Sequence, residues 1–140
     1  MINLASLQHA IGERLAASLI VTAQLGDHDG RVLAATDPNA QMPFLTFGED
    51  DVRDDSVGGL QAKDVRIAIH IWTREQGFSN CKAIDAAIVE EFDDKPLIVH
   101  GQRIVGIWHA TSRFMKDVRD DIRHGVTEFE VKTEASGPDV

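Results

Sequence analysis

Five carboxylates crowd the seven positions from Glu49 to Asp55, within the segment FGEDDVRDDSVGG at 47–59. They belong to Glu49, Asp50, Asp51, Asp54 and Asp55. Hard cations such as Mg²⁺ and Ca²⁺ take oxygen ligands of this kind from loops. The segment does not match an EF-hand, in which acids alternate and a glycine and a distal glutamate follow. A solvated, self-repelling loop is the simpler interpretation, and a weak metal site is the alternative.

The histidines show no spacing typical of a zinc hydrolase, which places two histidines one helical turn apart with a glutamate between them. They are scattered along the chain as His9, His28, His70, His100, His109 and His124. In GDHDG at 26–30, the ligand types Asp27, His28 and Asp29 stand among turn-forming residues, which favours a solvated turn. The sequence favours two separately solvated or hydrogen-bonded rings for His70 and His109. A contact between them across a sheet is the alternative.

Nucleophilic catalysis has no visible candidate in this sequence. No serine stands in a G-x-S-x-G elbow, and Cys81 lies on the apolar side of an expected helix, where a thiolate is disfavoured. Gly58 and Gly59 lack the Gly-Lys-Ser/Thr ending of a phosphate-binding loop. A small metal-dependent hydrolase that uses the acidic segment with His28 or His70 is therefore only an alternative function.

Two helices are predicted from apolar residues that recur every three or four positions. In the first helix these residues are Leu4, Leu7, Ile11, Leu15 and Leu19, and in the second they are Cys81, Ile84, Ile88 and Phe92. Asn3 and Ser79 are the expected N-terminal caps. Gly26 follows the first helix and Pro96 prevents continuation of the second.

Strands are predicted at 44–49, 65–72 and 124–134, the last two from alternation of apolar with polar residues. Residues 97–110 indicate two strands that turn at Gly101 and Gln102. The order predicts one α+β domain over 1–134, with two main helices packed on one face of a mainly antiparallel sheet, followed by a frayed tail at 135–140. Residues 34–43 are expected to form a loop.

The net charge of -9 argues against a protein that grips nucleic acid, because such affinity depends on cations that neutralise phosphates. A single cysteine excludes a disulfide framework within the chain. Neither a secretion signal nor an apolar segment of membrane-spanning length is visible, so the cytoplasm is the expected place of synthesis.

The combination and spacing of five segments resembles the tail completion or tail terminator family of long-tailed phages, prophages and gene transfer agents. The segments are PFLTFGE at 43–49, RIAIHIW at 66–72, AIDAAIVEEF at 83–92, RIVGIW at 103–108 and RHGVTEFEVKTE at 123–134. The resemblance covers about 4–134. The pair Gly48-Glu49 and the entry Arg123-His124-Gly125 look most like the gene transfer agent branch.

The resemblance implies a structural protein without catalysis or cofactor, which acts as part of the virion after synthesis in a bacterial host. Members of the family form a ring, usually six-fold, on the head-proximal end of the tail tube. The implied partners are further copies of the chain in a hexamer, the tail tube protein and the head-side connector or stopper. DNA would pass through the lumen without specific binding, and no membrane is involved. A protein-binding adaptor that never forms a ring is the other alternative.

Several residues are candidates for contacts in such an assembly. Trp72 and Trp108 are candidates for a second, exposed face of the sheet, although each also fits an ordinary core. The segment 111–125 has a composition common at docking surfaces but also fits a long hairpin loop, and its candidates are Arg113, Phe114, Met115, Arg119 and Arg123. The carboxylates of Glu49–Asp55 are expected either to face the bore, where they repel DNA, or to face basic residues at an interface.

Overall fold

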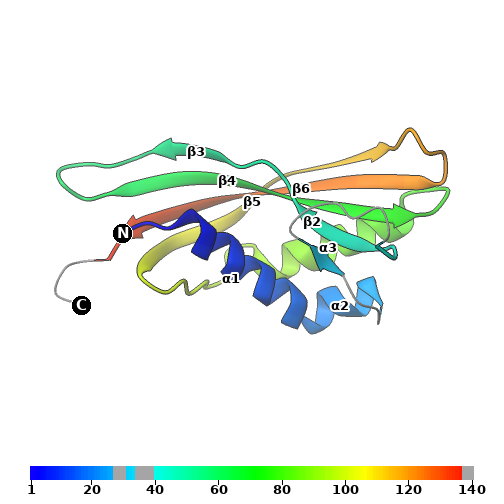
Figure 1. Ribbon diagram of the computed structural model, residues 1–140, viewed down its shortest axis with the longest axis horizontal. Helices are drawn as coiled ribbons and strands as arrows, with labels where there is room; N and C mark the ends of the chain where they lie inside the picture. The colour runs from blue at the N-terminus through cyan, green and yellow to red at the C-terminus, as the bar shows by residue number, and fades with distance from the viewer. Residues whose placement is uncertain (27–30, 34–39, 137–140) are drawn as a thin grey trace.

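One long sheet with helices packed on a single face makes up the computed structural model, which describes residues 1–26, 31–33 and 40–136 (Figure 1). The helices are α1 (Leu4–Ala17), α2 (Leu19–Leu25) and α3 (Ser79–Phe92). The strands are β1 (Val32–Leu33), β2 (Phe44–Phe47), β3 (Asp51–Asp54), β4 (Ala62–Arg74), β5 (Gln102–Lys116) and β6 (Ile122–Ala135). The predicted α+β class is confirmed. The expected turn at Asp27, His28 and Asp29 lies outside the described residues, as does most of the loop expected at 34–43.

The sheet is mainly antiparallel, as predicted. Its strands follow the order β1-β2-β4-β6-β5. Both β2 and β3 pair with the same edge of β4, β2 with residues 69–72 and β3 with residues 63–66. All pairings are antiparallel except β1 with β2. The expected period-two strand at 65–72 is the centre of β4, which pairs with β6 over its whole length.

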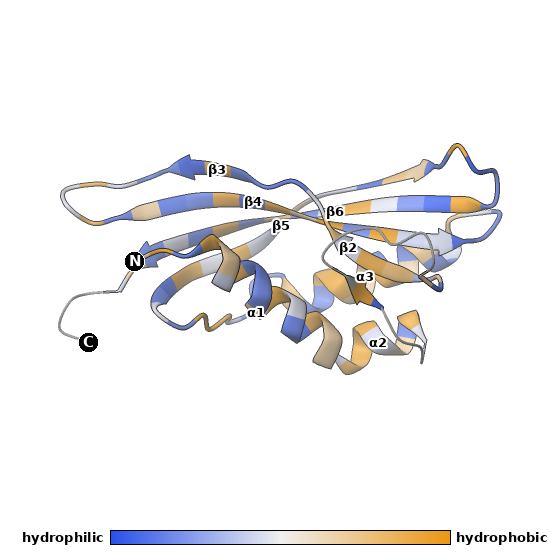
Figure 2. Cartoon of the chain, viewed as in Figure 1, coloured by the Kyte–Doolittle hydropathy of each residue, from blue (hydrophilic) through white to orange (hydrophobic). Residues whose placement is uncertain are grey.

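The two sides of β4 and β6 differ because side chains alternate along a strand. Figure 2 shows the hydrophobic and hydrophilic residues that alternate along β4. Isoleucines of β4 and Phe129 and Val131 of β6 join the core together with residues of the helices, so they lie on the side that the helices cover. We call this side the helix-covered face. The opposite side carries charged, imidazole and indole groups, and we call it the open face.

The first predicted helix is interrupted at Ser18. Asn3 caps α1 as expected, since its side chain accepts a hydrogen bond from the amide of Ser6. The Ser18 hydroxyl accepts from the amide of Val21 and so starts α2. Serine favours such caps because its hydroxyl competes for backbone groups. The prediction that Leu19 continues the buried side is wrong, because this side chain is 85% exposed.

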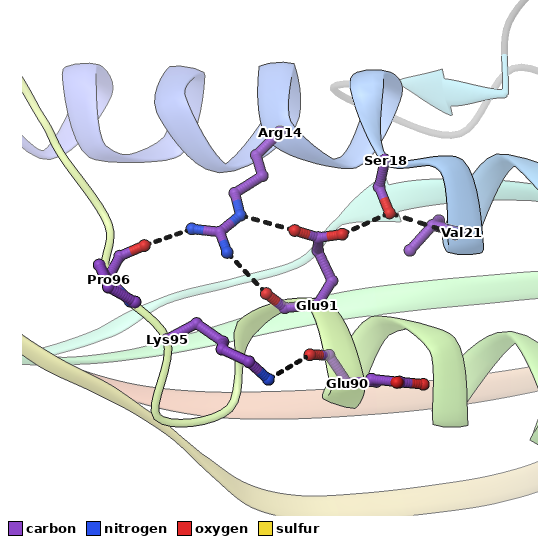
Figure 3. Close-up of polar contacts among 7 residues, drawn as sticks. All are labelled: Arg14, Ser18, Val21, Glu90, Glu91, Lys95 and Pro96. Atoms are coloured by element: carbon purple, nitrogen blue, oxygen red, sulfur yellow. Dashed lines mark hydrogen bonds and ion pairs between the residues drawn. The ribbon is translucent and has the colours of Figure 1, made fainter.

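Arg14 and Glu91 join the interrupted helix to α3 (Figure 3). The Glu91 carboxylate accepts from Arg14 Nε at 2.8 Å and from the Ser18 hydroxyl at 2.6 Å. The guanidinium also donates to the backbone oxygens of Glu91 and Pro96. These contacts fix the first two helices against the C-terminal end of α3.

The start of α3 corrects the predicted cap. Ser79 is the first helical residue, and Phe78 at the cap position makes no side-chain hydrogen bond. The carboxylate of Glu75 instead accepts from the amides of Asn80 at 3.0 Å and Cys81 at 2.9 Å. A carboxylate suits this place because the N-terminal end of a helix is electropositive.

The acidic segment was expected to be a loop, and here the prediction is wrong for its centre. Asp51–Asp54 form β3, which pairs with residues 63–66 of β4. The connecting turn places Gly58 at φ 57° and Gly59 at φ 85°, between the bridged residues Val57 and Leu60. Backbone pairing with the longer β4 stabilises a strand whose side chains bury almost nothing. We call residues 49–61 the acidic hairpin.

The two strands predicted around Gly101 are also corrected. Residues 97–100 form no strand beyond one bridge from Val99 to Gln102, although Leu97 and Val99 are buried. Further on, β5 extends to Lys116 and β6 begins at Ile122, so the long hairpin loop considered for 111–125 is a tight turn.

Candidate interaction face

The open face lies on the side of the sheet away from the three helices. The register pairs Trp72 with His124 and His70 with Val126 at one end of β4 and β6. Towards the other end it pairs Arg66 with Glu130 and Asp64 with Lys132. The face therefore has an aromatic end and a charged end.

Stacked rings form the aromatic end. The rings of Trp72 and His124 lie 3.9 Å apart between centroids and nearly parallel, at 8°. His70 Nδ1 and His124 Nε2 are 2.6 Å apart, a short hydrogen bond. The indole N–H of Trp72 donates to the Thr46 hydroxyl at 3.1 Å, and Phe44 lies 6.4 Å from Trp72.

Two residues of β5 complete this end of the face. Arg113 and Met115 pair with Val126 and His124 of β6 and share their side of the sheet. The structure gives Arg113 no ion pair among the described residues. We define the aromatic-imidazole patch as Phe44, His70, Trp72, Arg113, Met115 and His124. A shallow hollow of about 570 Å³ includes His70, Trp72, Arg113 and His124 in its lining.

Gly48 permits the position of the His70 ring. The Gly48 amide donates to the carbonyl of Ala68 at 2.9 Å, which holds the backbone against β4. A Cβ at Gly48 would stand 2.1 Å from His70 Nε2, closer than any real contact. Glycine is therefore required at position 48 because any side chain there would clash with the His70 ring.

Both imidazoles of the patch are held in the neutral form. Burial lowers the pKa of His124 to about 4, and the neighbouring His70 and Arg113 also lower it, whereas Asp117 raises it. Burial and the charge of Arg113 also lower the pKa of His70, against the opposing carboxylates of Glu128 and Glu49. Near neutral pH the patch thus presents one cation, Arg113, among uncharged rings.

Ion pairs cross the strands at the charged end of the open face. Lys132 Nζ lies 3.5 Å from a carboxylate oxygen of Asp55 and 3.7 Å from one of Asp64. The charges of Asp64 and Asp55 raise the pKa of Lys132. Arg66 and Glu130 form a further pair at 3.9 Å. The acidic hairpin is therefore tied to β6 through the Asp55 carboxylate.

The carboxylates of the acidic hairpin differ in their local partners. Asp51 lies 3.6 Å from Arg53, and Asp54 accepts from the Ser56 hydroxyl at 2.7 Å. All residues from Glu49 to Gln61 are exposed. The structure shows no group of three metal-ligating side chains among residues 1–26, 31–33 and 40–136.

The two tryptophans singled out in the sequence both belong to the open face. Trp72 is half-buried within the stack, whereas Trp108 is 37% exposed and lies across Gly106 on the edge strand β5. Trp108 pairs with Glu130, which places it on the side of the sheet occupied by Arg66. Neither indole belongs to the hydrophobic core cluster.

The candidates from 111–125 separate onto different surfaces. Arg113 and Met115 belong to the patch, whereas Phe114 points to the helix-covered face and meets the ring of Phe78 edge-on. Arg119 lies in the turn before β6 and pairs with Asp117 at 2.8 Å.

Arg123 is buried despite its charge. Its side chain is 6% exposed, and its guanidinium donates to the backbone oxygens of Gln76 and Asp120. The same group lies over the ring of Phe78, 5.4 Å from the centroid. Arg123 thus fixes the connection before α3 to the start of β6.

A histidine, a serine and an aspartate also meet on the helix-covered face, but in the wrong order for a catalytic triad. The Ser112 hydroxyl donates to Asp85 at 2.7 Å, and His109 Nε2 lies 2.8 Å from the same hydroxyl oxygen. In a triad the hydroxyl would instead give its proton to the imidazole. Asp85 also accepts from Thr127, so this cluster is a polar link between α3 and the sheet.

His109 does not face His70. The two rings lie on opposite faces, so the favoured prediction of separate histidines is confirmed for this pair. Burial raises the pKa of the Cys81 thiol to about 12, as expected for a thiol on an apolar helix side. Within the described residues no helix has the length and apolarity to cross a membrane.

Sequence reasoning missed the pair of His70 with His124. A signal was present, because the motifs Gly48-Glu49 and Arg123-His124-Gly125 both converge on this place. Their meeting depends on the pairing of β4 with both β2 and β6, which one sequence does not reveal.

Comparisons with known proteins point to one family. Residues 9–134 match the family model described as tail completion protein gp17. A chain of a solved structure, described as the virion of a native gene transfer agent particle, superposes with a TM-score of 0.84 at 24% identity. The superposition covers 94% of this chain and 97% of that chain, and at this identity it establishes a shared fold. Comparison with curated protein sequences gave no match.

Proposed function

The chain belongs to the tail completion protein gp17 family, and from this premise we propose that it caps the head-proximal end of a tail tube as a ring. Family membership confirms the resemblance drawn from the sequence, and the chain is a structural component of a phage-type tail and virion. The proposed ring is a hexamer that ends tube polymerisation and joins the tail to the head-side connector or stopper.

The observation that carries this proposal is the open face, which the described helices leave uncovered (Figure 1). Exposed aromatic groups and strand edges are surfaces that proteins cover or protect, because unpaired edges promote uncontrolled association. In a closed ring each subunit covers such a surface of its neighbour, so no uncovered surface is left to which further copies could add.

Tail length is the measurement that tests the proposal. Particles produced without this chain are expected to show tubes of uncontrolled length or tails without heads in electron micrographs, and the intact chain should restore both features. Tails of normal length joined to heads in its absence would contradict the proposal. Native mass spectrometry with and without Mg²⁺ and tail tubes counts the subunits. A monomer under every condition would favour the adaptor.

Two places in the ring suit the acidic hairpin. In the bore, its carboxylates would be multiplied by the number of subunits and would repel passing DNA phosphates, so that DNA slides through without binding. At an interface, they would face cationic side chains of a neighbour, of the tube protein or of the connector.

Replacement of the five acids by amides separates these places. The substituted residues are Glu49, Asp50, Asp51, Asp54 and Asp55. A bore position predicts normal particles with impaired DNA delivery, and an interface position predicts failure of assembly. Normal assembly together with normal delivery would contradict both.

A further inference from the structure

The two ends of the open face carry complementary chemistry. At one end the turn of the acidic hairpin exposes two apolar side chains, Val57 at 75% and Leu60 at 46%. Exposed carboxylates of Asp54 and Asp55 flank this turn. At the other end the aromatic-imidazole patch combines apolar rings with the cation of Arg113. One end thus presents what the other end would bind.

The turn of the acidic hairpin is a built structure. Val57 and Leu60 exchange backbone hydrogen bonds at 3.1 and 3.0 Å, and the Ser56 hydroxyl accepts from the amide of Ala62. Asp55 donates its amide to the carbonyl of Ala62 at 2.8 Å. An ordered turn loses little further conformational entropy when it docks. Its two aliphatic side chains are exposed to water in the isolated subunit, so their burial at a contact would lower the free energy.

A single subunit cannot bring the turn and the patch together. Ten residue steps of β4 separate Ala62, beside the turn, from Trp72 in the patch, roughly 33 Å at about 3.3 Å per residue. Figure 1 shows the turn between β3 and β4 at the opposite end of the sheet from the turn between β5 and β6. A contact between them therefore requires two copies arranged head to tail, and such contacts close into rings when the rotation allows.

We propose that the turn of the acidic hairpin of one copy docks on the aromatic-imidazole patch of the next copy. Val57 and Leu60 pack against Trp72 and Met115, and a carboxylate beside the turn meets Arg113. The inference rests on the proposed ring, for which it names the surfaces that join neighbouring subunits. It also assigns the acidic hairpin to an interface.

Charge supports a second copy as the occupant of the patch. Ion pairs already use the cations at the charged end of the open face, whereas Arg113 has none among the described residues. The neutral imidazoles leave Arg113 as the single positive charge of the patch. A partner that offers an apolar turn with neighbouring carboxylates matches this surface better than a basic or uncharged one.

Cross-linking between two variants tests the contact. Copies with Val57→Cys are mixed with copies with Met115→Cys under conditions of ring formation, and a short bismaleimide is added. We expect covalent dimers in the mixture and none from Met115→Cys alone. The native Cys81 is fully buried and its raised pKa keeps it protonated, so it contributes little background. The matched control replaces Met115→Cys with Ile98→Cys, an exposed residue outside the patch, and should give no dimer.

A second measurement needs no cross-link. Val57→Ser with Leu60→Ser should raise the protein concentration required for assembly at least about tenfold, since two apolar side chains lose their burial. Ile98→Ser removes an aliphatic group elsewhere that is even more exposed, at 90%, and should leave that concentration unchanged. Circular dichroism checks that each variant is folded.

The outcomes distinguish this contact from the ring itself. Dimers in the mixture together with the shifted assembly concentration support the docking. A ring that persists without these cross-links and tolerates both serines overturns the docking and leaves the ring intact. A pair of serines that leaves ring formation unchanged but blocks joining to tail tubes overturns it in favour of an unlike partner. A wild-type chain that stays monomeric even on tail tubes overturns both.

Discussion

The helix-covered face and the open face are built from the same two strands, yet they stabilise different things. On the helix-covered face, Ile67, Phe129 and Val131 are at most 2% exposed and belong to the core cluster that also contains residues of α3 and α1. On the open face, their strand neighbours Arg66 and Glu130 form an ion pair more than 40% exposed. Burial of apolar surface dominates folding, whereas exposed ion pairs contribute little. One face therefore holds the subunit together and the other is free to serve contacts.

The largest effect is expected from an aromatic residue of the helix-covered face. Phe129→Ala should lower the free energy of unfolding by about 3–5 kcal/mol, because it removes a buried ring and leaves a cavity. Chemical denaturation measures this change. Glu130→Ala, the next residue on the open face, is the matched control and should change the value by less than about 0.5 kcal/mol. Equal losses in both variants would contradict the division between the faces.

A smaller effect is expected at Gly125, where a Cβ would stand 2.7 Å from the Cys81 sulfur. Gly125→Ala should destabilise the fold by about 1–3 kcal/mol through overpacking. Adding Cys81→Ala makes room and should recover part of the loss in a double-mutant cycle.

The open-face counterpart is Gly48→Ala, whose Cβ would meet the half-buried ring of His70. A ring at the surface can rotate away, so the cost should be lower than at Gly125. The hydrogen bond between His70 and His124 should break, which nuclear magnetic resonance of the imidazoles would detect. A cost at Gly48 above that at Gly125 would show that the open face is packed as firmly as the core.

The imidazole pair predicts a dependence of stability on pH. The folded pKa of His124, about 4, lies below its ordinary value of 6.5 because of burial. Above pH 6.5 both states are neutral, and between 6.5 and about 4 only the unfolded state binds this proton. Stability should therefore fall as the pH drops through this window. The patch is partly exposed, so solvent screening makes the effect modest.

Substitution of the histidine isolates its share of that pH dependence. His124→Gln should flatten the fall in unfolding free energy between pH 6.5 and 4, the window set by the lowered pKa. His9→Gln replaces a 75% exposed imidazole on α1, outside the patch, and is the matched control for the loss of a histidine. The same slope in His124→Gln as in the wild type would remove the imidazole pair as its cause.

The smallest effect is expected in the acidic hairpin. Asp51→Asn loses only the exposed contact with Arg53 at 3.6 Å, so the free energy of unfolding should change by less than about 0.5 kcal/mol. Thermal denaturation of the subunit checks this value. A clear loss of stability would mean that the side chains of β3 contribute to the stability of the fold, which would contradict this prediction.

Local patterns were sufficient for most elements. The spacing of apolar residues predicted α1, α3, β4 and β6, because a buried side repeats with the period of its own backbone. The prediction of Asn3 as a cap was also correct, because its partner, the amide of Ser6, is only three residues away. The segments that resemble the tail completion family were correct as a set.

Predictions failed where the deciding contact lies outside the periodic pattern of the helix or strand itself, whether its partner is near or distant in sequence. The Ser18 hydroxyl interrupts the first helix because it caps α2 at Val21, and it also donates to Glu91 on α3. The strand β3 exists because β4 offers it a backbone edge. Glu75 replaced Ser79 as the cap of α3 through a contact that the helical pattern does not contain.

The sequence by itself determined the α+β class, the principal helices and strands and the family, because these follow from local periodicity and from an ordered set of motifs. Only the tertiary structure decided that His70, Trp72 and His124 share one patch beside Gly48. It also decided that Arg123 is buried, with its guanidinium on the backbone oxygens of Gln76 and Asp120. The physical reason is that strand register brings together residues more than fifty positions apart, and no local pattern encodes which strands pair.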